Sequence, residues 1–530
     1  MLKTFACGAA ALVLALAATD PALAQKHGGI LKMIHRDSPA NLSIHEESSI
    51  STIAPGMAIF NNLVMFDQHV AQHSFASIVP DLATDWSWDA AKTALTFHLH
   101  SGVTWHDGKP FGAQDVKCTW DMLSGKSPAK LRINPRESWY ENLDSVTVES
   151  DTQATFHLKR PQPSFLAFLA SGDSPVYPCH VSPAQMRSHP IGTGPFKFVS
   201  FKPNESMTLT RNEHYWKPDR PYLDGIEYTI IPNRSTQTLA FIAGKFDVTF
   251  PYEVTVENLK DIKSQAPKAI CQMSPTNVSV NLLLNRDAPP FDNADVRKAF
   301  ALTLDRHAFT KILSEGQAKV GGAMLPPPEG VWGLPPEILE TIPGFGADVA
   351  KNREAARALM TKLGYSADKR MPLKVSTRNI ALYRDPAVIL IDQLKEIYVD
   401  AELETVETAV WPAKVAKKQY AVGLNLTGAG VDDPDVQFYE NYVCKSIRNY
   451  SGYCNHAIDV LIDQQSQETD TAKRKQLVWQ IDKQLQEDVA RPIIMHLIGA
   501  TCWWPQVKNL TPMVNSIYNG WRMEDVWLDK

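Results

Sequence analysis

The chain has 530 residues and a formal net charge of −5, with 44% hydrophobic and 21% charged residues. These values are typical of globular proteins and exclude a disordered chain or an integral membrane protein. No block of Lys or Arg occurs, so the charge pattern gives no sign of a nucleic-acid-binding surface.

Residues 1–24 have the pattern of a secretory signal peptide. Lys3 supplies a positive charge, residues 9–18 form an apolar run, and Ala22-Leu23-Ala24 is an A-x-A cleavage site. The run is shorter than the roughly 20 residues that span a bilayer. A buried N-terminal helix is the alternative, but Asp20-Pro21 suits a processed segment better. We therefore expect a soluble periplasmic protein of 506 residues, which is long enough for two or more lobes.

The first elements along the mature chain are strands. Period-two alternation predicts a strand at residues 95–99 and a hairpin that turns at Asp151 and Thr152. Helical periodicity follows at residues 291–309, where Val296, Phe300 and Leu304 share a face and Asp292 or Asn293 is the predicted N-cap.

Two more helices and one long connection are predicted in the second half of the chain. Ala355, Leu359 and Leu363 lie in line on one predicted helix, which Gly364 ends. Residues 470–489 form a second amphipathic helix, ended by Arg491-Pro492. Between these blocks, the proline-rich segment 325–336 is typical of an irregular surface connection.

Six cysteines follow the signal segment, an even number that is compatible with disulfides in an oxidising compartment. Cys444 and Cys454 flank the polar segment KSIRNYSGY, whose glycine lets the chain fold back, so we expect these two to be bonded. The pairing of the other four stays open: Cys118, Cys179, Cys271 and Cys502. No C-x-x-C spacing occurs, so a zinc ribbon is not supported.

Sequence marks of catalysis are missing. The chain has no G-x-S-x-G, H-E-x-x-H or G-x-x-x-x-G-K-S/T pattern, so three common hydrolytic routes lack their motifs. We predict that the chain is not an enzyme and needs no cofactor or metal. A secreted hydrolase is kept as the alternative class.

Three ordered segments carry a family resemblance. They are LTFHLHSGVTWHDGKPFGAQDV at residues 95–116, IGTGPFKFVSFKPNESMTLTRNEHYWKPDRPYLDGIEYTII at 191–231, and VRKAFALTLDRHAF with its Asp305-Arg306 pair. The segments resemble solute-binding protein family 5, whose members serve dipeptide, oligopeptide and nickel ABC importers. Considered without the resemblance, the glycines and prolines of these segments have structural roles, because they fix turns.

The resemblance implies an α/β fold, the two-lobed type II periplasmic-binding-protein fold with an extra β-rich subdomain in lobe I. Lobe I would comprise residues 25–273 and 492–530, with the subdomain at about 79–190, and lobe II residues 274–491. The ligand would lie between the lobes and be enclosed by hinge closure.

The function implied is that of the periplasmic binding component of an ABC importer. It would act as a monomer that captures a short peptide or peptide-like solute and presents it to membrane permease subunits. A non-peptide solute such as an opine or a glycoside, or a role as chaperone or sensor partner, remains an alternative because a fold does not fix a ligand. Nickel is less favoured, since residues 424–435 contain no histidine.

The residues proposed for ligand binding come from both lobes. In peptide-binding relatives an aspartate three positions before the aspartate of a D-P step pairs with the free amine; here Asp433-Pro434 is that step and Gly430 holds the position. Asp432 then substitutes for the missing carboxylate, or the ligand lacks a free amine.

Four further residues complete the predicted site. Arg378 follows a strand, where it can grip a carboxylate, and Trp411 is either a ligand contact or a core residue. On the other lobe, Asp37 and Ser38 follow the first strand and are predicted to line the cleft.

Overall fold

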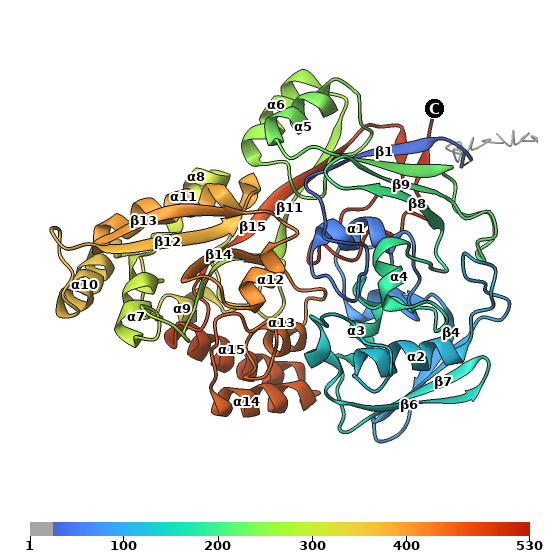
Figure 1. The fold of residues 1–530 in the computed structure, drawn as a ribbon, viewed down its shortest axis with the longest axis horizontal. Helices are drawn as coiled ribbons and strands as arrows, with labels where there is room; N and C mark the ends of the chain where they lie inside the picture. Colours follow the sequence, from blue (N-terminus) through green and yellow to red (C-terminus); the bar gives the residue numbers. More distant parts are fainter. Residues whose placement is uncertain (1–24) are drawn as a thin grey trace, which may run out of the picture.

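The structure is a computed structural model that describes residues 25–530, so the predicted signal peptide lies outside the described residues. Figure 1 shows two masses of structure joined by two long strands, β11 (Ile270–Leu284) and β15 (Ile493–Trp503). We call the mass that holds β1 to α6 lobe I and the mass that holds α7 to α15 lobe II.

Lobe I contains two four-stranded sheets. One has the order β1-β10-β9-β8, in which β1 (Ile30–His35) runs parallel to β10 (Gly225–Ile230), and β9 (Ser206–Arg211) and β8 (Phe196–Lys202) follow in antiparallel pairing. The other has the order β4-β5-β7-β6 and lies within the predicted subdomain: β4 (Ala83–Trp88), β5 (Ala94–Leu99), β7 (Gln153–Leu158) and β6 (Leu143–Ser150). The predicted hairpin is confirmed, since β6 pairs with β7 across Asp151 and Thr152.

The remaining elements of lobe I pack around these sheets. Apolar side chains of both sheets and of the neighbouring helices form two buried clusters, one centred on the subdomain. The elements are α1 (Ile50–Met57), β2 (Val64–Phe66), β3 (Ile78–Pro80), α2 (Ala113–Leu123), α3 (Phe165–Ala170), α4 (Pro183–Ser188), α5 (Arg234–Ile242) and α6 (Val256–Gln265).

Lobe II is built on a five-stranded sheet of order β13-β12-β14-β11-β15. Its strands β12 (Met371–Arg378), β13 (Val399–Val406) and β14 (Val422–Thr427) are parallel, so their carboxyl ends meet at one edge. The helices are α7 (Ala294–Thr303), α8 (Arg306–Ser314), α9 (Pro336–Leu339), α10 (Val349–Lys362), α11 (Ala381–Leu394), α12 (Trp411–Ala416), α13 (Pro434–Asn441), α14 (His456–Gln467) and α15 (Thr471–Glu487).

The two long strands are antiparallel partners and connect the lobes. Cys271 lies opposite Cys502 in their register, and a disulfide joins the two residues with an S–S distance of 2.03 Å. The predicted lobe boundary after Met273 falls inside β11, and the boundary after Arg491 lies just before β15. The tail after β15 returns to lobe I, where β16 (Val507–Lys508) pairs with β17 (Trp527–Leu528).

The helix predictions hold in part. Asn293, one of the two predicted candidates, is the N-cap of α7. The helix predicted from residue 470 is confirmed as α15, and the structure adds that Asp470 is its N-cap. The single helix predicted at residues 291–309 is two helices, because Leu304 leaves the helical conformation and Asp305 caps a new helix, α8. In α10 the fully buried side chains are Ala356 and Met360. Of the predicted face, Leu359 and Leu363 are partly buried against the same core, and Ala355 is exposed.

The proline-rich segment 325–336 is irregular up to the start of α9, as predicted, but only part of it lies on the surface: Pro327, Pro328 and Val331 are exposed. Leu325, Trp332 and Leu334 are buried, and the Arg474 guanidinium lies 4.7 Å from the centre of the Trp332 ring. Prolines lack a backbone N–H, so this segment can be buried with fewer donors to satisfy.

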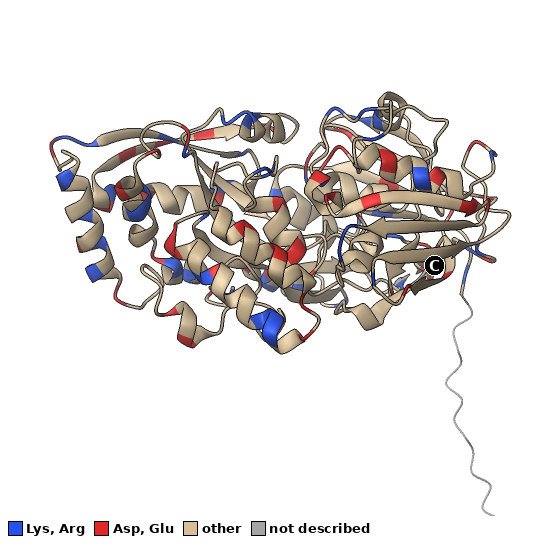
Figure 2. Cartoon of the chain, turned by 90° about the horizontal axis from the view of Figure 1, so that it is seen from below, with Lys and Arg blue, Asp and Glu red and all other residues tan. Residues whose placement is uncertain are grey.

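Charged residues of both signs are interspersed over both lobes (Figure 2). A search of residues 25–530 finds no helix with the length and apolarity needed to cross a membrane.

Candidate functional site

A cavity of about 80 Å³ lies between the lobes, lined by residues from both. Lobe I contributes the loop between β1 and α1, and lobe II contributes the carboxyl ends of β12 and β14 and the start of α12. Typical ligand pockets hold roughly 300–1,000 Å³. The lobes are therefore closed over this site, which lies beyond the carboxyl ends of parallel strands, where α/β sheets bind ligands.

Two predicted ligand residues bond to each other across the lobes. Asp37 follows β1 in lobe I, and Arg378 ends β12 in lobe II, with Arg378 Nη2 2.6 Å from Asp37 Oδ2. Thr408 of lobe II donates to the same oxygen at 2.6 Å, and Ser51 donates to Asp37 Oδ1 at 2.5 Å. Arg378 lines the cavity and holds its planar group against Tyr383, 4.8 Å from the ring centre.

The electrostatics of this pair follow from its surroundings. Burial alone would raise the pKa of Asp37, but Arg378 and then Arg36 hold that pKa well below its ordinary value. The carboxylate is thus charged at neutral pH and stabilised by a cation from the opposite lobe. Because the two charges come from different lobes, the pair forms only when the lobes are together, and it stabilises that arrangement.

Trp411 also lines the cavity and is buried, so it is both a cleft residue and a core residue. It begins α12, and its Nε1 donates to Asn425 Oδ1 on β14 at 3.1 Å. That hydrogen bond fixes the plane of the indole.

Gly430 does not line the cavity, because lobe I fills its surroundings. A Cβ at this position would lie 2.7 Å from Ser171 Oγ and even closer to Asp173 Oδ2. Asp173 is itself paired with Arg136, a buried ion pair within lobe I. The lack of a side chain at Gly430 lets these two lobes approach closely.

Asp432 and Ser38 also lie away from the residues that line the cavity. Asp432 Oδ2 accepts from Asn515 Nδ2 at 3.3 Å, and burial raises the pKa of Asp432 to about 7. Ser38 Oγ accepts from the backbone N–H of Asn204 in the turn between β8 and β9.

The sequence analysis missed Glu47, which lines the cavity from the loop before α1. Its Oε1 accepts from Asn41 Nδ2 at 2.5 Å, and burial raises the pKa of Glu47 to about 7. The two consecutive acids in HEESS, shortly after the first strand, are the signal that could have drawn attention to it. Several aromatic residues of the cavity were missed as well: Tyr252, Tyr383, Tyr450 and Tyr518.

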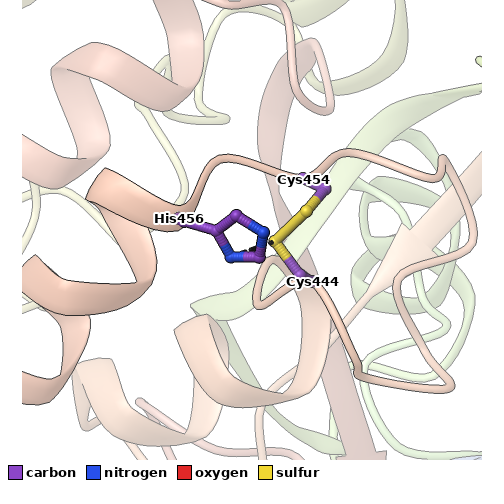
Figure 3. Close-up of side chains that lie close together, drawn as sticks. All are labelled: Cys444, Cys454 and His456. Atoms are coloured by element: carbon purple, nitrogen blue, oxygen red, sulfur yellow. Dashed lines mark hydrogen bonds between the residues drawn. A yellow bond between two sulfur atoms is a disulfide. The ribbon is translucent and has the colours of Figure 1, made fainter.

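The structure bonds Cys444 to Cys454, the pair that the sequence singled out. Figure 3 shows the imidazole of His456 beside this disulfide, with Nδ1 3.7 Å from Cys444 Sγ. Among residues 25–530, these three are the only group of His, Cys, Asp and Glu side chains close enough to share a metal ion. Both sulfurs are used in the disulfide, so neither is a thiolate ligand while that bond is present.

Two lobes, two crossover strands and a cavity between the lobes are the architecture of a hinged binding protein. Comparison with protein families identifies it further. Residues 77–449 match the bacterial extracellular solute-binding proteins, family 5 Middle, and the chain belongs to this family. The family resemblance and the type II fold predicted from the sequence are confirmed.

Individual relatives support the same class. The chain is 24% identical over 488 residues to di/tripeptide-binding protein 1 of Pseudomonas aeruginosa, which covers 86% of each chain. The structure of a periplasmic binding protein of Helicobacter pylori in complex with peptide STSA matches with a TM-score of 0.82 at 22% identity, over 95% of this chain and 99% of that one. A binding protein from A. tumefacien R10 in complex with agropinic acid matches with a TM-score of 0.81 at 19% identity, over 95% and 99%.

These findings fix the class of the protein. It is an extracytoplasmic solute-binding component of an ABC importer, and the secreted hydrolase kept as an alternative is not supported.

Proposed function

We propose that the interlobe cleft captures a short peptide or peptide-like solute and that the closed protein delivers it to permease subunits at the inner membrane. One observation carries this proposal: Arg378 of lobe II meets lobe I at the cavity, at the edge where the parallel strands end. When the lobes part, Arg378 loses Asp37 and presents a planar guanidinium that can hold a carboxylate through two hydrogen bonds. The curated relative named for di- and tripeptides supports a peptide as the solute.

Residues 1–24 would be removed by cleavage, leaving a periplasmic monomer. Of the predicted ligand residues, Asp37, Arg378 and Trp411 take part in this proposal, because they line or border the cavity. Gly430 would act through close lobe contact, whereas Ser38 and Asp432 have no direct part in it.

A second candidate solute is a small acidic compound of the opine type. It is favoured by the structural neighbour that holds agropinic acid, and Arg378 would bind its carboxylate in the same way.

The test combines recovery of the solute with a measurement of shape. Protein purified from the periplasm is examined by mass spectrometry, and a peptide would support the first candidate over the second. Saturating solute should reduce the radius of gyration in X-ray scattering without a change in mass, because the lobes close on it. An unchanged scattering profile with a tightly bound solute would refute the hinged mechanism.

A further inference from the structure

Four charged side chains line the cavity, and three of them have a carboxylate partner outside it. Arg378 pairs with Asp37 at 2.6 Å, Arg36 pairs with Glu253 at 3.2 Å, and Arg448 pairs with Glu440. The three guanidinium charges are therefore compensated by the protein itself. The fourth charged residue is Glu47.

Glu47 is the only carboxylate among the described residues that line the cavity, and it is poorly compensated. Its nearest cation is Arg132, whose Nη2 lies 3.8 Å from Oε1 and whose side chain is 56% exposed. Asn41 and Arg132 both contact Oε1, and the side-chain hydrogen bond of Glu47 within residues 25–530 goes to that oxygen, so Oε2 is left for another donor. Glu47 itself is only 7% exposed.

A buried carboxylate without a close cation is unfavourable, and the environment of Glu47 shows that cost. Burial raises the pKa of Glu47 to about 7, against the lowering effects of Arg132, Asn41 and Arg136, while the neighbouring Glu46 raises it further. A cation supplied by the solute would remove this cost. The aromatic rings of Tyr252, Trp411 and Tyr450 line the same cavity and favour an organic cation over a hydrated metal ion.

From this geometry we infer that Glu47 binds a cationic group of the solute, an ammonium or a guanidinium, through its free Oε2. The inference rests on the proposed function, because it assigns a role within the same cleft. It narrows the solute to compounds that carry a positive charge, such as a short peptide with a free α-amine.

The experiment uses the mature protein, isothermal calorimetry at pH 7.5, and two probes that differ only in the cation: trialanine and N-acetyl-trialanine. The native protein should prefer trialanine. Glu47→Gln, which keeps the contact with Asn41, should weaken trialanine binding by about 30-fold or more and remove the preference. Glu47→Asp should retain it.

Glu46→Gln is the control for loss of a neighbouring buried carboxylate, since Glu46 bonds Arg187 at 3.0 Å, shares Arg132 with Glu47 and does not line the cavity. It should leave the preference for trialanine in place. Circular dichroism and melting temperature establish that each variant is folded. Binding to the native protein should also tighten from pH 6 to pH 8 and release a proton, and Glu47→Gln should do neither.

The outcomes separate this inference from the proposed function. Equal binding of both probes, or full trialanine binding by Glu47→Gln, would overturn the inference and leave a peptide receptor. A recovered solute that is cationic but not a peptide, and that binds Glu47→Gln weakly, would support the inference and overturn the peptide class. A recovered solute without a cation would overturn the inference. If trialanine does not bind and no solute is recovered, both the inference and the proposed peptide-binding function are overturned.

Discussion

Two charged regions of the cleft differ in how far the protein itself neutralises them. At Asp37 and Arg378, each lobe supplies one charge, and Thr408 and Ser51 satisfy the carboxylate further. At Glu47, the carboxylate has one amide donor and a distant, exposed Arg132. The charges at Asp37 and Arg378 are fully paired when the lobes close without a solute, whereas the charge of Glu47 lacks a close cation. Arg378 must therefore leave Asp37 before it can bind a solute, whereas Glu47 is available without giving up an ion partner from the opposite lobe.

The largest effect is expected from Arg378→Met, which leaves Asp37 enclosed with only Arg36 as a cation, 3.6 Å away. Removing one member of a buried ion pair costs about 3–5 kcal/mol. In the hinged mechanism proposed above, the solute-free protein exchanges between open and closed forms, and opening avoids this cost. Before solute is added, the variant should therefore populate the open form more and have a larger radius of gyration than the native protein. X-ray scattering measures this change, and Arg384→Met, at an exposed position of α11, is the control. Equal compactness of Arg378→Met and the native protein would mean that the pair does not hold the lobes together.

The next effect concerns Glu47. Removal of a paired charge usually destabilises a protein, but removal of this poorly compensated charge should raise the free energy of unfolding at high pH. The folded protein holds the Glu47 proton more strongly than the unfolded chain, because the pKa is raised from 4.5 to about 7. Stability is therefore lost as pH rises from 4.5 to 7, by about 3 kcal/mol in total. Glu47→Gln should remove this loss and be more stable than the native protein at pH 8, but not at pH 4.

Urea unfolding at the two pH values measures the difference. Glu46→Gln should change stability in the opposite direction at pH 8, because it loses an ion pair with Arg187. A Glu47→Gln variant that is less stable than the native protein at pH 8 would show that this carboxylate is already compensated within the protein.

A smaller effect tests whether Asp37 is stabilised from within its own lobe or from across the cleft. Thr408→Val removes the donor from lobe II, and Ser51→Ala removes the donor from lobe I. A hydrogen bond to a charged group contributes about 1.5–3 kcal/mol. Thr408→Val should favour the open form in scattering, whereas Ser51→Ala should lower the free energy of unfolding without favouring opening. The same response from both variants would contradict the division of roles between the lobes.

Local patterns predicted much of the fold. The hairpin at Asp151 and Thr152, the cap Asn293 and the helix from residue 470 depend on neighbouring residues, so periodicity and capping chemistry identified them. The apolar face of α10 was predicted in part: Leu359 and Leu363 pack against the core, but the packing partners bury Ala356 and Met360 more deeply. Local propensity is a weak guide where tertiary contacts decide.

Tertiary contacts also limited what the sequence could predict about the site. Arg378 was found because it follows a strand, and Trp411 because the family resemblance implies an aromatic ligand contact near this position; the structure places both at the cavity. The partner of Arg378 could not be found from sequence, since Asp37 belongs to the other lobe. Gly430 is surrounded by Ser171 and Asp173 for the same reason. Contacts between distant segments leave no local pattern.

The smallest expected effect comes from Trp411→Phe, which tests the aromatic part of the cleft. The substitution keeps an aromatic face toward the cavity but removes the hydrogen bond from Nε1 to Asn425 Oδ1. A neutral hydrogen bond contributes about 1 kcal/mol, so the variant should lose that much stability in urea unfolding. Its preference for trialanine over the acetylated peptide should match that of the native protein, because Glu47 is unchanged. Loss of this preference would mean that the indole, and not the Glu47 carboxylate, distinguishes the two probes.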